Sequence, residues 1–267
     1  MSARDPGLAF TDGALQFDAW SEKLWDPMGR DVVLAAKIQP GEKVLDACCG
    51  TGAATIPASL AVGPTGTVDG VDLSTGLLRM AAANLAERGI LNTTLTEADV
   101  TEWRGHRTFD AVLCSYSMFF FADMEAGVEH LASMLRPGGR LVASTWVEGA
   151  LEPFAGLILE AAIKERPRLA GVVPLANQNM AKIASADSLA GWLTARGLAD
   201  VSVTTHPLTL TVDDAMAWDL VMGSGWRTLL PRDPEAISRV RRDFIKSVGP
   251  QVDMNSDALI GIGSVPA

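Results

Sequence analysis

The sequence predicts an α/β fold, a doubly wound parallel sheet carrying helices that connect its strands. From residue 44 to residue 146, short apolar runs bounded by Gly, Pro, Asp or Ser alternate with stretches whose apolar residues recur every three or four positions. Hydrophobic residues make up 48% and charged residues 20% of the 267 residues, which is typical of a globular protein and excludes a disordered or fibrous chain.

The elements of this region follow from the same pattern. Strands are expected at 43–48, 66–72, 93–98, 109–115 and 139–146. Helices are expected at 55–62, 74–88 and 123–135, because their apolar residues line one face. Ser74 is expected to cap the second of these helices, and the segment RPGG at 136–139 is expected to end the third and turn the chain into the fifth strand.

The segments outside this region are expected to be mostly helical. Helices are expected within 14–38, 151–186, 187–196 and 213–250, and β runs at 201–211 and 257–263. No internal repeat or low-complexity tract is present in the sequence, so we expect one core with added helices and not a repeat array.

Charge and cysteine content restrict the class of protein. The 22 Lys and Arg against 32 Asp and Glu give a net charge of −10, so the field of the whole molecule repels nucleic acid and anionic membranes. Cys48, Cys49 and Cys114 do not form the spaced framework of a secreted protein, and a reducing cytoplasm is expected. No export signal or membrane span is expected, since no basic and apolar leader and no long apolar run occur.

The most informative segment is VLDACCGTG at residues 44–52, an apolar strand followed by a tight turn into a helix. Gly50 and Gly52 let a ligand approach the backbone closely, and the start of the helix offers free N–H groups. A nucleotide-like ligand is therefore expected at this turn, although the turn alone also fits a plain tight connection.

Two acids follow the next two strands. Asp72 stands where a carboxylate can accept both hydroxyls of a ribose, or can cap a helix. Asp99 stands where a carboxylate can accept from the exocyclic amine of adenine while the Val100 N–H faces a ring nitrogen, or can be a solvated loop acid. The carboxyl ends of parallel strands meet at one edge of the sheet, so these residues together predict a nucleoside site there.

A dinucleotide is the competing ligand at this turn. The dinucleotide fingerprint Gly-x-Gly-x-x-Gly has Thr55 in its third glycine place here, and no phosphate-binding Lys follows the glycines. Asp46 precedes the turn, where an acid suits an ammonium group better than a pyrophosphate. S-adenosylmethionine, an adenosyl sulfonium with an amino-acid tail, is therefore the expected ligand.

The segments VLDACCGTG, VDGVDLS, EADV, FDAVLCSYSMFFF and LRPGGRLVAS occur in this order between about residues 40 and 146. Through them the chain resembles the class I S-adenosylmethionine-dependent methyltransferases, in particular the ubiquinone/menaquinone biosynthesis branch. The resemblance implies that Asp46, Gly50, Thr51 and Gly52 surround the methionine part, Asp72 holds the ribose, Leu73 packs on the adenine, Asp99 and Val100 bind its edge, and Ser115 lies beside the cofactor. The family's first turn glycine is Cys48 here, which predicts a slightly altered turn.

The resemblance also implies a seven-stranded Rossmann-like sheet in the order 3-2-1-4-5-7-6, whose last strand is antiparallel. The β runs at 201–211 and 257–263 suit strands six and seven. Residues 1–39 are then expected to form a helical lid, and residues 40–267 a core with helical cap insertions at about 151–186 and 213–250 that roof a substrate pocket.

Methyl transfer from a sulfonium is an in-line displacement, so alignment and exclusion of water are sufficient and a base is optional. Tyr116, the single tyrosine, follows the fourth strand and is expected either as a pocket wall or as a hydrogen-bonding catalytic group. His206 precedes Pro207 and is the second catalytic candidate, the alternative being a structural histidine. The aromatic residues expected to line the substrate pocket are Trp20, Trp25, Phe119 and Trp146, and no metal site is expected.

These observations predict a methyltransferase of secondary metabolism that acts on a small aromatic or polyketide-like metabolite. O-methylation is favoured, and C- or N-methylation stays open. The alternative is a protein that binds S-adenosylmethionine without methyl transfer, as a regulator or in another adenosyl-dependent reaction. A small-molecule acceptor is the expected partner, a homodimer is the assembly to test for, and neither nucleic acid nor membrane is expected to bind.

Overall fold

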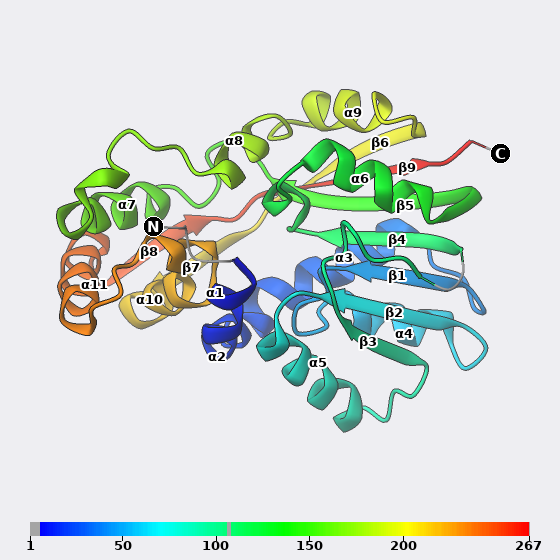
Figure 1. The fold of residues 1–267 in the computed structure, drawn as a ribbon, viewed down its shortest axis with the longest axis horizontal. Coiled ribbons are helices and arrows are strands. Elements are labelled where there is room, and N and C mark those ends of the chain that lie inside the picture. Colours follow the sequence, from blue (N-terminus) through cyan, green and yellow to red (C-terminus); the bar gives the residue numbers. More distant parts are fainter. Residues whose placement is uncertain (1–5, 106–107, 267) are drawn as a thin grey trace.

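A sheet of mixed strand direction forms the centre of the molecule, which a computed structural model describes for residues 6–105 and 108–266. Within these residues the sheet has seven strands in the order β3-β2-β1-β4-β5-β9-β6 (Figure 1). They are β1 Lys43–Ala47, β2 Thr67–Asp72, β3 Thr93–Glu97, β4 Phe109–Ser115, β5 Leu135–Trp146, β6 Ala199–His206 and β9 Ala258–Ser264. With β9 as the seventh strand, this confirms the expected order 3-2-1-4-5-7-6. As also expected, β9 is antiparallel to both of its neighbours, β5 and β6.

Helices cover both faces of the sheet, because its central strands bury side chains on both sides. Ala111 and Leu113 of β4 belong to one apolar cluster, and the alternate residues Val112 and Cys114 belong to the other. The first cluster includes residues of α3 (Asp26–Ala36) and α4 (Thr55–Val62), and the second includes residues of α6 (Met124–Ser133) and α9 (Ala186–Thr194).

The helix after β2 begins as the sequence predicts. The Ser74 side chain accepts a hydrogen bond from the Leu77 N–H and caps α5 (Thr75–Glu87), which packs against β2 and β3. Since β2 ends at Asp72, only one residue separates the strand from this cap, and the short connection places Asp72 at the helix start.

The start of the fifth strand differs from the prediction. β5 begins at Leu135, opposite Phe109, and not at residue 139. The pairing then shifts so that Ala111 faces Arg140, and Gly138 lies in the left-handed region with φ 71°. The RPGG segment is thus an irregularity within the strand, because its glycine absorbs the extra residues while the pairing continues.

The second β run also differs from the prediction. The expected single strand at 201–211 breaks at Pro207, which has no N–H to donate, and the Leu208 N–H binds the Asp257 side chain instead. The chain continues as β7 (Thr209–Asp213), which pairs with β8 (Gln251–Asn255) in a separate two-stranded sheet. The sequence pattern does not predict β8.

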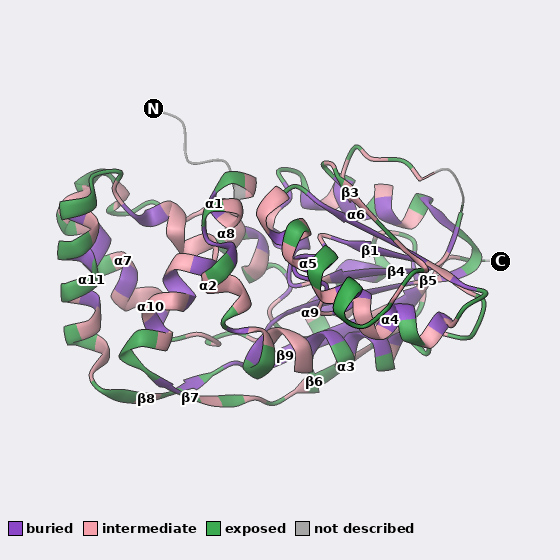
Figure 2. Ribbon diagram, turned by 90° about the horizontal axis from the view of Figure 1, so that it is seen from below, coloured by how far each residue is buried: buried purple, intermediate pink, exposed green. Residues whose placement is uncertain are grey.

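A second lobe lies beyond the carboxyl ends of the parallel strands (Figures 1 and 2). The β7–β8 ribbon leads from β6 and β9 into it, as Figure 2 shows along the lower side of the molecule. Its helices are α7 Phe154–Glu165, α8 Leu175–Ala181, α10 Asp214–Gly223 and α11 Pro234–Val248.

The N-terminal helices lie between the lobe and the sheet. They are α1 Pro6–Asp12, α2 Ala14–Asp18 and the π-helical turn η1 Ser21–Trp25, followed by α3, which packs against β4 and β5. A Cβ on Gly13 would lie 2.2 Å from the Met222 carbonyl oxygen, and one on Gly223 would lie 2.3 Å from the Phe17 nitrogen. The backbones of α2 and α10 therefore touch, which only glycine permits at these two positions.

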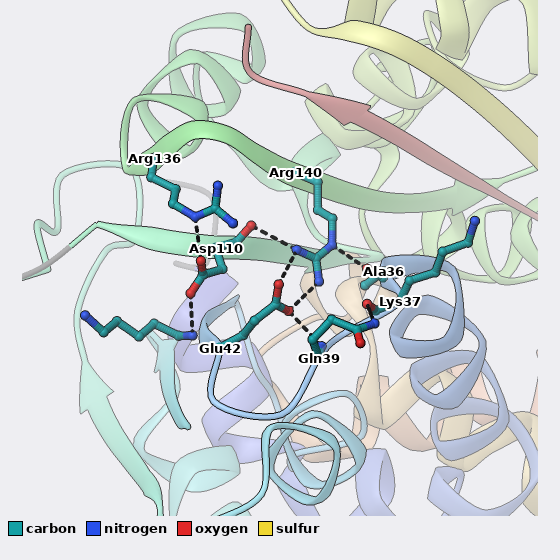
Figure 3. Close-up of polar contacts among 8 residues, drawn as sticks. Ala36, Lys37, Gln39, Glu42, Asp110, Arg136 and Arg140 are labelled. Atoms are coloured by element: carbon teal, nitrogen blue, oxygen red, sulfur yellow. Dashed lines mark hydrogen bonds and ion pairs between the residues drawn. The ribbon is translucent and has the colours of Figure 1, made fainter. Parts of the chain in front are cut away.

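A polar cluster fixes the opposite, amino edge of the sheet (Figure 3). The Arg140 guanidinium donates to both carboxylate oxygens of Glu42 and to the Ala36 carbonyl at the end of α3. Asp110 accepts from the Lys43 N–H and from Arg136. The pKa of Asp110 is lowered even though burial opposes this, because these two donors favour its ionised form.

Of the helices described, none has the length and apolar character needed to cross a membrane.

Candidate cofactor and acceptor site

The turn after β1 depends on three left-handed residues. Gly50 and Gly52 have φ values of 56° and 95°, and Cys48, at the place of the family's first glycine, has φ 60°. A left-handed residue with a Cβ is unfavourable by about 1–2 kcal/mol, so the surroundings must hold Cys48 in place. The Cys49 N–H donates to the Val71 carbonyl, which ties the turn to β2.

Asp72 holds the same turn from the neighbouring strand. One carboxylate oxygen accepts from the Gly50 N–H at 2.9 Å, and the other accepts from the Ser74 N–H at 2.8 Å. Burial raises the pKa of Asp72, while these backbone donors act in the opposite direction. The carboxylate is therefore fixed in orientation, at the position where the sequence predicts ribose recognition.

Asp46 lies in the interior below the turn. Its carboxylate accepts a hydrogen bond from the Thr55 hydroxyl at 2.5 Å, and burial raises its pKa to about 7, with the charge of Asp72 acting in the same direction. Two buried carboxyl groups close to one another favour a cationic ligand, since a cation offsets both desolvation and mutual repulsion. This charge pattern fits the ammonium and sulfonium groups of S-adenosylmethionine. The hydrogen bond from Thr55 to Asp46 is not predicted from the sequence, in which Thr55 stands out only as a mismatch to the dinucleotide fingerprint.

The remaining predicted cofactor residues lie at the same edge of the sheet. Leu73 is half exposed although it is apolar, which suits a residue that packs on a ligand. Asp99 is exposed and one of its oxygens accepts from the N–H and hydroxyl of Thr101, while Val100 beside it is buried. The Ser115 hydroxyl at the end of β4 lies 3.2 Å from that of Ser144.

The N-terminal helices contact the cofactor elements directly. The Phe17 ring lies 3.6 Å from the position that a Cβ on Gly50 would take. The Ser21 and Thr51 hydroxyls are 3.5 Å apart, and those of Thr11 and Ser74 are 3.0 Å apart. Apart from the apolar spacing of the N-terminal helices, nothing in the sequence predicts these contacts.

An aromatic group follows β4 and β5 at the same edge. The Tyr116 ring centroid lies 4.3 Å from Trp146 and 6.3 Å from Trp25, and Trp25 stacks on Phe17 at 4.8 Å. Among the residues described, the buried Tyr116 hydroxyl has no hydrogen-bond partner. Burial raises the pKa of this phenol, with the Asp31 charge adding to the effect. A buried and unpartnered hydroxyl at this edge is suited to bind a polar atom of a ligand.

Trp20 and Phe119 have other partners. The Trp20 indole N–H donates to the Met216 carbonyl and ties η1 to α10. Phe119, in the 3-10 turn η2 (Met118–Phe120), packs on Phe120, and its carbonyl accepts from the Asn179 side chain of α8. The structure thus brings Trp25 and Trp146 to Tyr116, whereas Trp20 and Phe119 join the lobe to the core.

His206, at the end of β6, uses both ring nitrogens. Nδ1 lies 3.1 Å from the Asp31 carboxylate on α3, and Nε2 lies 2.9 Å from the Thr204 hydroxyl. These contacts connect α3 to the edge strand and leave neither nitrogen free for an acceptor. No cluster of His, Cys, Asp or Glu able to bind a metal occurs in residues 6–105 and 108–266.

Fold and site together define an α/β protein whose glycine turn and acidic strand ends meet at the carboxyl edge of its sheet, where open α/β sheets bind ligands. A family model described as a methyltransferase domain matches residues 44–139. Aklanonic acid methyltransferase DauC of Streptomyces sp. strain C5 is 34% identical over 166 residues, 60% of this chain and 76% of that protein. Nocamycin O-methyltransferase of Saccharothrix syringae is 33% identical over 170 residues, 59% of this chain and 61% of that protein.

A demethylmenaquinone methyltransferase of Anoxybacillus flavithermus is 32% identical over 114 residues, 42% of this chain and 48% of that protein. The solved structure of the YcgJ protein of Bacillus subtilis superposes with a TM-score of 0.60 at 15% identity, over 90% of this chain and 99% of that one. The chain belongs to the class I S-adenosylmethionine-dependent methyltransferases, and S-adenosylmethionine is its cofactor. The alternative of a binding protein without methyl transfer is therefore set aside.

Proposed function

We propose that the enzyme transfers the methyl group to a hydroxyl of a flat aromatic, polyketide-like metabolite. The observation that carries this proposal is the aromatic group of Trp25, Tyr116 and Trp146 with its unpartnered phenol hydroxyl. Phe17, which stacks on Trp25 and lies against Gly50, connects this group to the cofactor turn. Aromatic faces suit a planar acceptor, and the phenol can bind its oxygen. The similarity to aklanonic acid methyltransferase and nocamycin O-methyltransferase supports this acceptor class.

We propose the following cofactor contacts. The residues around the methionine part would be Asp46, Gly50, Thr51 and Gly52, the ribose would be held by Asp72, and the adenine would lie against Leu73, Asp99 and Val100, with Ser115 nearby. When bound, the cofactor supplies an electrophilic methyl group. The fixed Asp72 carboxylate and the buried Asp46 would orient the nucleoside and the ammonium group, respectively.

The acceptor side would work by alignment. Tyr116 would donate its phenol hydrogen to the acceptor oxygen or a neighbouring oxygen and orient it toward the methyl group. Trp25 and Trp146 would hold the acceptor plane and exclude water. His206 has no such role in this proposal, because Asp31 and Thr204 occupy its nitrogens.

The helical additions would close the site. Of the predicted lid at 1–39, the helices of residues 6–25 touch Gly50, Thr51 and Ser74 and would form the lid, whereas α3 packs against β4 and β5. The lobe formed by the insertions at about 151–186 and 213–250 would roof the acceptor. Such a roof on an acidic chain favours a small cytoplasmic metabolite over nucleic acid.

The proposal is tested by incubating the purified protein with S-adenosylmethionine and a panel of acceptors, with release of S-adenosylhomocysteine as the readout. The panel pairs each hydroxylated anthraquinone or naphthoquinone with its deoxy and its amino analogue. Turnover with the hydroxylated member alone is expected. Turnover confined to amines, or to carbon acceptors without a hydroxyl, would contradict O-methylation and leave the methyltransferase assignment intact.

A further inference from the structure

The chain changes direction where β4 ends. The β4–β5 pairing stops at Ser115 opposite Ser144, and the next residue, Tyr116, has φ 51°. This left-handed conformation is unfavourable for a residue with a Cβ, so contacts around it must hold it in place.

The change of direction decides which face of the sheet the tyrosine ring occupies. Ser115, Ser144 and Trp146 share one face, because Ser115 and Ser144 are opposite one another and β5 alternates from Ser144 to Trp146. An extended residue 116 would point to the other face. Its ring instead lies 4.3 Å from Trp146, so the left-handed kink turns the ring to the side of the aromatic group.

The Ser144 side chain binds the backbone N–H of Tyr116 at the kink. The Tyr116 N–H donates to Ser144 Oγ at 3.1 Å. Ser144 is completely buried, and its Oγ also lies 3.2 Å from that of Ser115. Without the Ser144 hydroxyl, a buried N–H would have no partner, which is the kind of defect that folded proteins avoid by shifting the backbone.

We propose that Ser144 is a positioning residue for methyl transfer, whose hydroxyl holds Tyr116 in the kinked conformation that places its phenol at the acceptor. The catalytic part of this inference rests on the proposed function, since it requires Tyr116 to contact the acceptor. The structural part, that Ser144 sets the conformation of Tyr116, stands by itself.

The test uses the fact that the chain has a single tyrosine. Protein labelled with carbon-13 at the tyrosine ζ carbon gives one resonance from Tyr116, observed in the full-length wild type and in variants. Ser144→Ala is expected to shift or split this resonance and to let tyrosinate form at lower pH, because the ring loses its buried position. Ser144→Thr and Ser144→Val form a matched pair of the same shape, in which only threonine keeps the hydroxyl and the wild-type resonance.

A control and a rate measurement complete the test. Ser256→Ala removes an equally buried hydroxyl that has no partner among the described residues, and is expected to leave the tyrosine resonance unchanged. With an acceptor from the panel, Ser144→Ala and Tyr116→Phe are each expected to lower the transfer rate about tenfold, and the double variant no further. A transfer rate in the double variant that falls by the product of the two single reductions would overturn the catalytic part of the inference.

The two parts fail in different ways. A wild-type resonance and wild-type tyrosinate titration in folded Ser144→Ala or Ser144→Val would overturn the inference. A shifted resonance with an unchanged rate in Tyr116→Phe would uphold the positioning by Ser144 and overturn the role of Tyr116 in the proposed function.

Discussion

The Thr55 hydroxyl donates to the Asp46 carboxylate at 2.5 Å, at a place from which solvent is excluded. This donor and carboxylate lie beneath the glycine turn, with the Asp72 carboxylate near enough to raise the pKa of Asp46 further. The protein without cofactor thus holds an acid that is only partly ionised near neutral pH, and a cationic ligand at this place would favour the ionised form.

In the proposed site, Asp46 should make cofactor binding depend on pH. Its pKa, about 7 in the folded protein, lies above the ordinary value of 3.8, so its contribution to stability is present below about pH 4 and is lost as the pH rises through 7. The cofactor binds the ionised form, so its affinity should rise about tenfold per pH unit below 7 and level off above it. Calorimetric titration from pH 5.5 to 8.5, a range of about three units, measures this. Asp46→Asn should show a flat profile, and an equally steep profile in that variant would exclude Asp46 as the titrating group.

Asp72 should control both the turn and the cofactor. Asp72→Ala removes the acceptor for the Gly50 and Ser74 N–H groups, so cofactor affinity should fall at least about tenfold. The matched control is Glu97→Gln, which changes an exposed carboxyl opposite Asp72 on β3 and should bind normally. Wild-type cofactor affinity in folded Asp72→Ala would show that the ligand lies elsewhere.

His206 should be replaceable without loss of catalysis. Its two nitrogens are engaged by Asp31 and Thr204, so His206→Ala should keep the transfer rate within about twofold and cost about 1 kcal/mol of unfolding free energy or less. Steady-state rates and urea denaturation measure the two quantities. A loss of transfer rate as large as that of Tyr116→Phe would instead show that His206 acts in catalysis.

Arg140 should matter for stability and not for chemistry. Arg140→Ala removes the ion-pair partner of the poorly exposed Glu42 carboxylate, which keeps only the Gln39 N–H as a donor, and the donor to the Ala36 carbonyl, at the edge opposite the site. The expected loss is about 2–3 kcal/mol of unfolding free energy, with cofactor affinity unchanged. Arg136→Ala removes a more exposed pair and should cost about 1 kcal/mol or less. Equal losses in the two variants would contradict this difference.

The first five strands and the acidic strand ends could be predicted because they depend on local patterns, whereas the order of the sheet follows only from the resemblance to the family. Apolar runs mark β1 to β5, and Asp46 and Asp72 stand at fixed places relative to them. The β7–β8 ribbon could not be predicted in this way, because β8 is a short strand whose pairing with β7 spans about forty residues. Pro207 indicates that the strand breaks after His206, but it does not indicate that β7 then pairs with β8.

The contacts of the site depend more strongly on tertiary structure. Tyr116 and Trp146 could be expected at the active edge from their positions after strands. The kink at Tyr116 could not, because it requires a serine on another strand. The contact of His206 with Asp31 could not be predicted either, because Asp31 lies 175 positions earlier in the chain and nothing in its helix indicates that pairing.

The way the lobe joins the sheet has a consequence for how such an enzyme can change. Two segments form the lobe, and the second of them leaves the sheet after His206 and returns at Ala258, two residues that are partners on adjacent strands. Entry and exit are therefore side by side, so the intervening 51 residues (207 to 257) form a cassette that a different length of chain can replace without moving a strand. In the proposed function this cassette is part of the roof over the acceptor, so the range of acceptors could change through it while the cofactor half stays the same.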